Sequence, residues 1–390
     1  MRLKQNIVMF VILFLLLSSI CVGIKVRNNI NESIQKEPTD EIIDDVIPTT
    51  FVGSINDKYN VPKEIMDVIV NYMDDYFESV YTLEKQDTTE YFVNDIDGKV
   101  SDYAIKLTIE ARKLYDTDLT MSDAHYDLKI TDYFSSNGKY YVDFLEDDYF
   151  YFKFLNGISS ETYDVENSMV IEKIDDEYKI SEYEKVQGYY MMFNDNKDEN
   201  FDEVYKLCFD CFIDEKNNRQ LSLDKSFSSD KTYDIKYDRN AATKYASTYY
   251  HMRNDDYYDF EDEGGNCQNF ASQSLLAGGM IMDENGEYNW YFNDYSDYDS
   301  SFVHVGSFEE YCMENEGRGL VCELPSNVFY AEPGDIVQVG VKSVSHTTIV
   351  SRIVDGHILL NSNSIDMKDF PLEAYTYPTK KLIKIIGSNY

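Results

Sequence analysis

The first long apolar run of the chain, residues 7–24, carries no charged side chain, and Arg2 and Lys4 precede it. Basic residues ahead of an apolar core are the layout of a secretory signal. The run is also just long enough to cross a bilayer. It therefore predicts either a cleaved signal peptide or an uncleaved signal anchor over residues 1–24. In both cases we expect the body of the protein outside the cytoplasm, released or held at the cell surface.

Between residues 59 and 192 the apolar positions change from a helical period to a strand period. Pro62 can begin one helix, and Ser101 can cap a second. Alternating strands follow, with a strong hairpin signal at Asn137-Gly138. Two helices followed by a meander of strands predict an α+β domain with helices on one face of a curved antiparallel sheet. In layout this resembles a cystatin-like or nuclear-transport-factor-like cone.

Two polar segments predict linkers. Residues 25–58 are charged and contain two prolines, which is typical of a flexible connection. Residues 193–235 combine an amphipathic helical pattern with a polar stretch. Cys208 and Cys211 lie in that pattern at the spacing of a redox motif, so a thiol–disulfide exchanger stays open beside core packing. A second domain then spans residues 236–390.

The centre of the second domain is a short stretch bounded by glycine pairs. After Gly264 and Gly265, small and apolar residues fall at helical spacing, which predicts a helix with Cys267 in its first turn. A thiol there feels the positive end of the helix dipole, which favours the nucleophilic thiolate. The alternative is a small buried cysteine at the start of a core helix. The acidic residues just before it oppose thiolate formation unless they point away.

Strand patterns follow the cysteine helix. His346 begins one predicted strand, and a turn at residues 355–356 leads to the next. Side chains alternate along a strand, so Asn361 and Asn363 share one face of that second strand. An asparagine on a neighbouring strand could orient the far nitrogen of His346.

These segments together resemble a known family. Five segments are similar to the "putative amidase domain" of exported bacterial proteins. They are residues 237–242, the stretch from Cys267 to Gly279, Trp290, residues 333–338 and residues 346–350. That family belongs with the NlpC-like, papain-like cysteine peptidases and amidases. The resemblance runs from about Tyr237 to the C-terminus, and it implies a papain-like fold for this half of the chain.

The resemblance also implies roles for individual residues. Cys267 matches the nucleophile and His346 the general base, while Asn363 is the best match for the orienting residue and Asn361 the second. Gln268 and Asn269 follow the nucleophile, where backbone or side-chain donors could hold an oxyanion. The sequence departs from the family at two positions. Asn266 stands where aspartate is usual, and Phe302 stands where tryptophan is common.

Composition narrows the choice of partners. The formal net charge of −37 argues against nucleic-acid binding and against adhesion to anionic lipid. We expect a monomer that needs no metal or cofactor and meets the membrane only through its N-terminal segment. The expected function is hydrolysis of an amide, such as a cell-wall peptide in peptidoglycan, by Cys–His acyl transfer. The alternative is a catalytically silent wall-binding or scaffold protein. Cys312 and Cys322 could form a small bridged loop.

Overall fold

The computed structural model describes residues 51–390 except residue 117 and residues 224–226. The predicted signal or anchor, residues 1–24, and most of the predicted linker at residues 25–58 lie outside the described residues. Within the part that is described, no helix combines the length and the apolar character needed to cross a bilayer.

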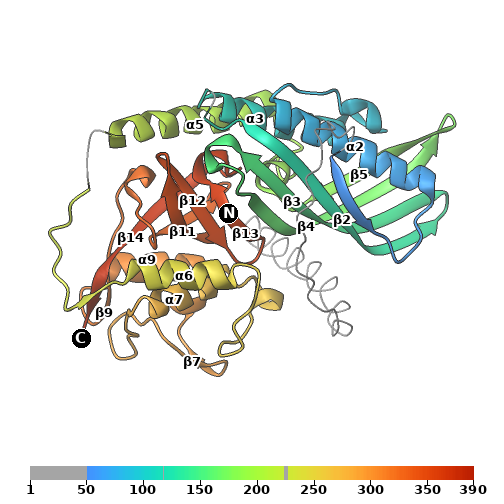
Figure 1. The fold of residues 1–390 in the computed structure, drawn as a ribbon. Helices are drawn as coiled ribbons and strands as arrows, with labels where there is room; N and C mark the ends of the chain where they lie inside the picture. The colour runs from blue at the N-terminus through green and yellow to red at the C-terminus, as the bar shows by residue number, and fades with distance from the viewer. Residues whose placement is uncertain (1–50, 117, 224–226) are drawn as a thin grey trace, which may run out of the picture.

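The described chain is a mixed α+β structure built on one large mixed sheet (Figure 1), which confirms the α+β part of the predicted fold class. The α-helices are α2 (Lys63–Thr82), α3 (Asp95–Lys113), α4 (Gly188–Asn194), α5 (Phe201–Leu223), α6 (Arg239–Tyr249), α7 (Cys267–Ala277), α8 (Ser300–Val303) and α9 (Val305–Glu314). The strands of the N-terminal half are β1 (Val52–Asn56), β2 (Met121–Ser136), β3 (Lys139–Phe152), β4 (Ser160–Ile174) and β5 (Glu177–Lys185). Those of the C-terminal half are β6 (Ile235–Lys236), β7 (Phe292–Asp294), β8 (Asp297–Tyr298), β9 (Gly319–Glu323), β10 (Ile336–Gly340), β11 (His346–Val354), β12 (His357–Ser362), β13 (Asp366–Pro371) and β14 (Thr379–Asn389).

In the N-terminal half, β2 to β5 form an antiparallel meander against which α2 and α3 pack. Asn137 and Gly138 both have positive φ, 53° and 79°, as the predicted two-residue hairpin requires. The first strand, β1, pairs in parallel with β2, although the sequence places it in the linker. The likeness of this half to a cystatin-like cone stays a prediction.

The second helix begins earlier than the sequence suggests. The Asn94 side chain caps α3 by accepting from the N–H groups of Ile96 and Asp97. Ser101 is therefore not the cap. It is buried inside α3, where its hydroxyl lies 2.8 Å from the Tyr72 hydroxyl.

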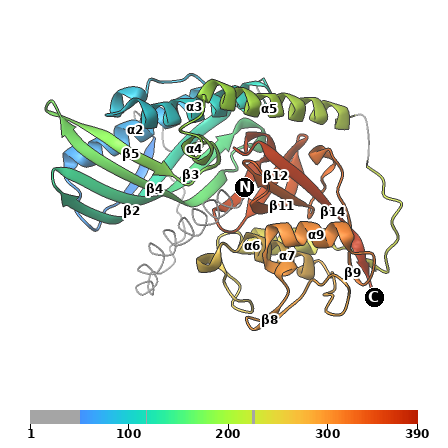
Figure 2. The ribbon, with the colours of Figure 1, turned by 180° about the vertical axis from the view of Figure 1, so that it is seen from behind.

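The sheet continues from one half of the chain into the other. β13 pairs antiparallel with the first residues of β4, with Asp366 opposite Tyr163 and Lys368 opposite Glu161. The later part of β4 pairs instead with β5. The strand order is therefore β1-β2-β3-β4-β13-β12-β11-β10-β14-β6, with β9 added beside β14. Figure 2 shows this junction from behind, with the green and red strands in one surface.

The C-terminal part of the sheet is covered on both faces. Ile336 and Ile349 pack with α6, α7 and α9 in one core, whereas Val337, Val339 and Val350 join the core of the N-terminal half. This follows from strand alternation, since neighbouring side chains point to opposite faces. In both views α5 lies on one side of β11 and β12, and α6, α7 and α9 lie on the other.

Candidate functional site

Cys267 is the first residue of α7, as predicted. The two glycines before it, Gly264 and Gly265, have φ of 113° and 107°, a region that favours glycine, so the chain can turn sharply into the helix. The first intrahelical bond runs from the Phe270 N–H to the Asn266 carbonyl. The N–H groups of the first helical turn therefore face outward around the sulfur.

The start of α7 is joined to the start of β11. The backbone N–H groups of Thr347 and Gln268 act to lower the pKa of the Cys267 thiol. The Thr347 hydroxyl donates to the side-chain oxygen of Gln268 at 2.8 Å. Because His346 directly precedes Thr347, the fold brings the predicted nucleophile and base to adjoining positions. No hydrogen bond joins Cys267 to His346 among the described residues.

Burial dominates the electrostatics of this pair. Cys267 is 6% exposed and His346 is 7% exposed. Burial raises the pKa of Cys267 to about 11, although the two backbone N–H groups act to lower it. Burial lowers the pKa of His346 to about 4, and the charge of Asp366 partly opposes that shift. The sequence predicted that the helix start would favour the thiolate, but desolvation is the larger effect. At neutral pH the resting site holds a thiol and a neutral imidazole.

The His346 ring carries an unused polar atom. Its Nε2 is buried and has no hydrogen-bond partner among the residues that the structure describes. A buried polar atom of this kind costs about 1–3 kcal/mol and is uncommon in folded proteins. A substrate or a reacting group at this position would give Nε2 a partner.

Neither predicted orienting residue is hydrogen-bonded to His346. The Asn363 amide donates to the carbonyls of Tyr249, Tyr250 and Met252, at 3.0 to 3.3 Å, and its oxygen accepts from Asn266. The oxygen of Asn361 accepts from a backbone N–H of β13. Asn361 is paired with Ile349, which points to the opposite face of the sheet from His346.

The side chains predicted to help at the oxyanion are also engaged. Gln268 accepts from Thr347 and donates to the Ser272 hydroxyl at 3.2 Å. Asn269 donates to the Tyr258 carbonyl at 2.9 Å and to the Asn266 side chain at 2.7 Å. Asn269 therefore uses both of its amide N–H groups within the fold and Gln268 uses one, while the backbone N–H groups at the start of α7 are further donors that could hold an oxyanion.

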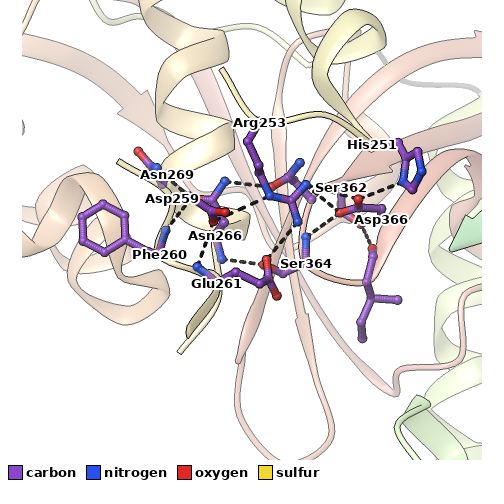
Figure 3. A network of polar contacts seen from close by, with 12 residues as sticks. His251, Arg253, Asp259, Phe260, Glu261, Asn266, Asn269, Ser362, Ser364 and Asp366 are labelled. Carbon is purple, nitrogen blue, oxygen red and sulfur yellow. Dashed lines mark hydrogen bonds and ion pairs between the residues drawn. The ribbon is translucent and has the colours of Figure 1, made fainter. Parts of the chain in front are cut away.

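A polar network holds the start of α7 in place (Figure 3). Asn266 is at its centre, because its amide donates to Asn363 at 2.8 Å and its oxygen accepts from Asn269 and from the Phe260 N–H. The Asn266 backbone N–H donates to the Ser364 hydroxyl. The turn between β12 and β13 is thereby tied to the residue before the thiol.

Arg253 and Asp366 extend this network, and the sequence interpretation missed both. The Arg253 guanidinium contacts Asp366 at 3.1 Å and Glu261 at 3.0 Å. His251 contacts the other oxygen of Asp366 at 3.0 Å. In the sequence Arg253 stands beside a run of acidic residues, and this was the only local indication that it could form an ion pair. The pairing shows how the acidic loop is tolerated: Glu261 is held by Arg253 and Ser364.

The turn that carries Ser364 is strained. Ser364 and Ile365 have φ of 67° and 57°, a left-handed conformation that is rare for a β-branched residue. Two contacts maintain it, from the Ser364 N–H to Asp366 at 2.9 Å and from the Ser362 hydroxyl to the Ile365 carbonyl at 2.9 Å. Strain that the surroundings maintain is typical of functional sites.

The remaining cysteines are placed differently. Cys208 is buried beside Met192, with the two sulfurs 3.0 Å apart, and burial raises its pKa to about 12. Cys211 is exposed on the same helix. The Cys322 thiol donates to the Cys312 sulfur at 3.1 Å between α9 and β9, and the two form no disulfide. No group of three or more potential metal-ligating His, Cys, Asp or Glu side chains occurs in the described part of the chain.

Comparisons with known proteins bear on the same half of the chain. Residues 236–386 match the family described as "Putative amidase domain". A Bacillus subtilis (strain 168) protein described as "Uncharacterized protein YhbB" is 32% identical over 140 residues, which cover 34% of this chain and 43% of that relative. The chain thus spans less than half the length of this relative. No solved structure matches.

Proposed function

We propose, from the amidase-family domain at residues 236–386, that this protein is a cysteine-dependent amidase or peptidase. The family match supports amide hydrolysis in general. The cysteine mechanism is supported by one observation above all: Cys267 begins α7, and the residue after it, Gln268, is hydrogen-bonded at 2.8 Å to Thr347, the residue after His346. A papain-like fold for this half is part of the proposal.

The proposed chemistry begins with proton transfer from Cys267 to His346. The sulfur attacks the amide carbonyl, a C–S bond forms, and the carbonyl electrons move onto oxygen. The N–H groups at the start of α7 hold that oxyanion. The C–N bond then breaks as the His346 imidazolium returns the proton to the leaving amine. Water, deprotonated by His346, hydrolyses the thioester.

The pKa values decide when the thiolate forms. Proton transfer from Cys267 to His346 is opposed in the closed site, because burial raises the pKa of the thiol and lowers the pKa of the imidazole. A stable thiolate–imidazolium pair is therefore not the resting state. Proton transfer accompanies attack on a bound substrate, and the charge of Asp366 favours the imidazolium formed at that moment.

Asn363 acts in this proposal as a positioning residue. It does not contact His346 but fixes Asn266, and through it the start of α7. The proposed substrate is an amide of the cell wall, such as a peptidoglycan stem peptide, met outside the cytoplasm. This part of the proposal is supported by the apolar segment at residues 7–24 and by the family resemblance.

The test is digestion of purified peptidoglycan by the full chain, with new amino groups quantified and products identified by mass spectrometry. Cys267→Ala is expected to abolish amine release, and His346→Ala to lower it by at least about 100-fold. Cys211→Ala, which removes an exposed thiol remote from α7, is the matched control and should act like wild type. Equal product profiles from wild type and Cys267→Ala would reject the hydrolase.

The burial of Cys267 and His346 also suits the alternative, a catalytically silent wall-binding or scaffold protein. That alternative predicts that the full chain co-sediments with wall material and releases no amine. The thiol–disulfide exchanger predicts instead that Cys211→Ala abolishes activity and that Cys267→Ala does not.

A further inference from the structure

A cavity lies beside the second half of α7, beyond the first turn that carries Cys267. Its volume is about 390 Å³, a size typical of sites for small molecules. Its walls come from α6, the loop after α6, α7 and β7, and Figure 1 shows β7 on the side of α7 away from the large sheet. Gln273, one of the wall residues, lies about 9 Å along the helix axis from Cys267. The cavity is therefore separate from the Cys267 site but near it.

A chain of hydrogen bonds fixes how Gln273 faces this cavity. The Asn254 side-chain oxygen accepts from the Asp256 N–H at 3.0 Å, so its amide nitrogen is the group that donates to the Tyr245 hydroxyl, at 2.8 Å. That hydroxyl in turn donates to the Gln273 side-chain oxygen at 2.6 Å. Gln273 is only 4% exposed, and its amide nitrogen donates to no residue in the described part of the chain. Two N–H donors are therefore left for a ligand in the cavity.

Most of the other walls are apolar. Tyr257 and Phe292 present aromatic rings whose centroids are 5.5 Å apart. Leu276 and Met282 complete the apolar surface. Asp256, whose side chain is exposed, adds a carboxylate at the rim. The cavity thus combines an apolar surface with a few polar groups of fixed position, which is the usual composition of a site for a small molecule.

The chemistry of these walls fits a neutral ligand. The described residues that line the cavity include no lysine, arginine or histidine, so an anion would lack a countercharge. A cation would face the N–H groups of Gln273, which need an acceptor instead. An acetamido group offers a carbonyl oxygen to Gln273, and the hydroxyls of a sugar can donate to Asp256. The apolar face of the same sugar ring can pack on an aromatic side chain.

One loop borders both this cavity and the start of α7. Tyr257 lines the cavity, and the carbonyl of the next residue, Tyr258, accepts from the Asn269 side chain at 2.9 Å. The Phe260 N–H donates to the side chain of Asn266, the residue before the thiol, at 3.3 Å. A ligand in the cavity therefore lies beside a loop that is hydrogen-bonded to the first turn of α7.

We propose that this cavity binds an N-acetylated sugar and is a glycan subsite beside Cys267. The sugar ring packs on Tyr257 and Phe292. Its acetamido oxygen accepts from Gln273, and its hydroxyls donate to Asp256. Sugar binding is inferred from the cavity alone, whereas its role as a subsite rests on the proposed function. The substrate class that follows is an amide carried on a glycan, in preference to a free peptide.

The experiment titrates the N-acetylglucosamine trimer into the full chain and measures binding by saturation-transfer NMR. Wild type and Cys267→Ala are expected to bind with equal Kd, since the sulfur lies outside the cavity. The glucose trimer, which lacks acetamido groups, should bind at least about tenfold more weakly, because one hydrogen bond has an effect of about this size. Equal binding of the two trimers would overturn the proposal.

Two variants locate the binding. Gln273→Met keeps the length of the side chain but removes the donor, and Asp256→Ala removes the acceptor at the rim; each should raise Kd about tenfold. Asp255→Ala is the matched control, because Asp255 is exposed beside Asp256 but does not line the cavity, and its Kd should stay within about twofold of wild type. Thermal unfolding checks the fold of each variant. Should Gln273→Met fail to fold, the exposed Asp256 still decides the outcome.

This inference and the proposed function fail separately. No binding of the N-acetylglucosamine trimer, or a Kd that Asp256→Ala leaves unchanged, overturns the inference even when amine release from peptidoglycan depends on Cys267. Binding of a lysine-containing peptide in place of the sugar, lost in Asp256→Ala, would also overturn it. Sugar binding with the expected variant effects, together with equal amine release by wild type and Cys267→Ala, would leave the sugar site standing and overturn the proposed function.

Discussion

Asn266, the residue before the predicted nucleophile, holds other residues of the site in place through its side-chain amide. Its amide nitrogen donates to Asn363, whose own amide is turned away toward three backbone carbonyls. An aspartate at position 266 cannot donate, and Asn363 cannot rotate without losing its other contacts. The residues around position 266 therefore suit the asparagine found in this chain better than the aspartate that is usual in the family.

We expect Asn266→Asp to destabilise the protein by about 1–3 kcal/mol, since two oxygens would then face each other in a buried contact. Chemical denaturation at neutral pH measures this change. Asn285→Asp makes the same substitution at an exposed position and should change the free energy of unfolding by less than about 0.5 kcal/mol. Equal effects of the two variants would contradict the role given to Asn266.

His346 should make stability depend on pH. Its pKa is 6.5 in the unfolded chain and about 4 in the folded protein, so between these values only the unfolded state binds the proton. Stability is therefore lost as pH falls from about 6.5 to about 4, by about 3 kcal/mol for this group. Comparing wild type with His346→Gln at pH 7.5 and pH 4 isolates the effect. Parallel pH profiles for the two proteins would show that His346 is not buried as a neutral ring.

At the scale of elements, α7 and β11 form the site because each begins there. A helix presents unpaired N–H groups only at its first turn, and a strand can offer a free N–H to a thiol only where its neighbour has ended. β12 ends at Ser362, close to the start of β11, and the strained turn at residues 364–365 then redirects the chain toward β4. The site is thus built from the ends of elements.

The α9–β9 pair supports a redox prediction. Because the Cys312 and Cys322 sulfurs are 3.1 Å apart, an added disulfide reagent such as oxidised glutathione should link them, with loss of two thiol hydrogens and release of two glutathione thiols. The link should stabilise the protein by roughly 2 kcal/mol, and mass spectrometry of alkylated peptides identifies it. Cys312→Ser should remove the effect. Oxidation that instead joins separate chains would contradict the prediction.

At the scale of the whole molecule, the two halves are joined by more than a linker. β13 extends the N-terminal sheet through β4, and residues of β10, β11 and β12 lie in the N-terminal core. A buried ion pair adds to this junction, because Lys380 on β14 donates to Glu215 on α5 at 2.8 Å and 3.0 Å. The site is therefore supported by residues distant in the sequence.

We expect Lys380→Met to destabilise the protein by about 3 kcal/mol or more, because it leaves the Glu215 carboxylate buried without its cation. Lys381→Met is the matched control. Lys381 pairs with Glu309 at the surface, and such pairs contribute less than about 1 kcal/mol. Denaturant unfolding of the full chain should show one transition in wild type. Similar losses in the two variants would argue against a buried junction.

Short-range patterns in the sequence were enough to predict several local features of this protein. Cys267 at a helix start, His346 at a strand start and the Asn137-Gly138 turn were all predictable, because periodicity, glycine placement and turn chemistry act over a few residues. The amidase-family half was recognisable from its motifs for the same reason.

The surroundings of those features depend on how distant segments of the chain pack together. The pairing of β13 with β4, the choice of Asn266 as the partner of Asn363, and the burial that holds the thiol and imidazole neutral all depend on segments far apart in the chain. Desolvation and long-range pairing are properties of the packed molecule, so no local pattern records them.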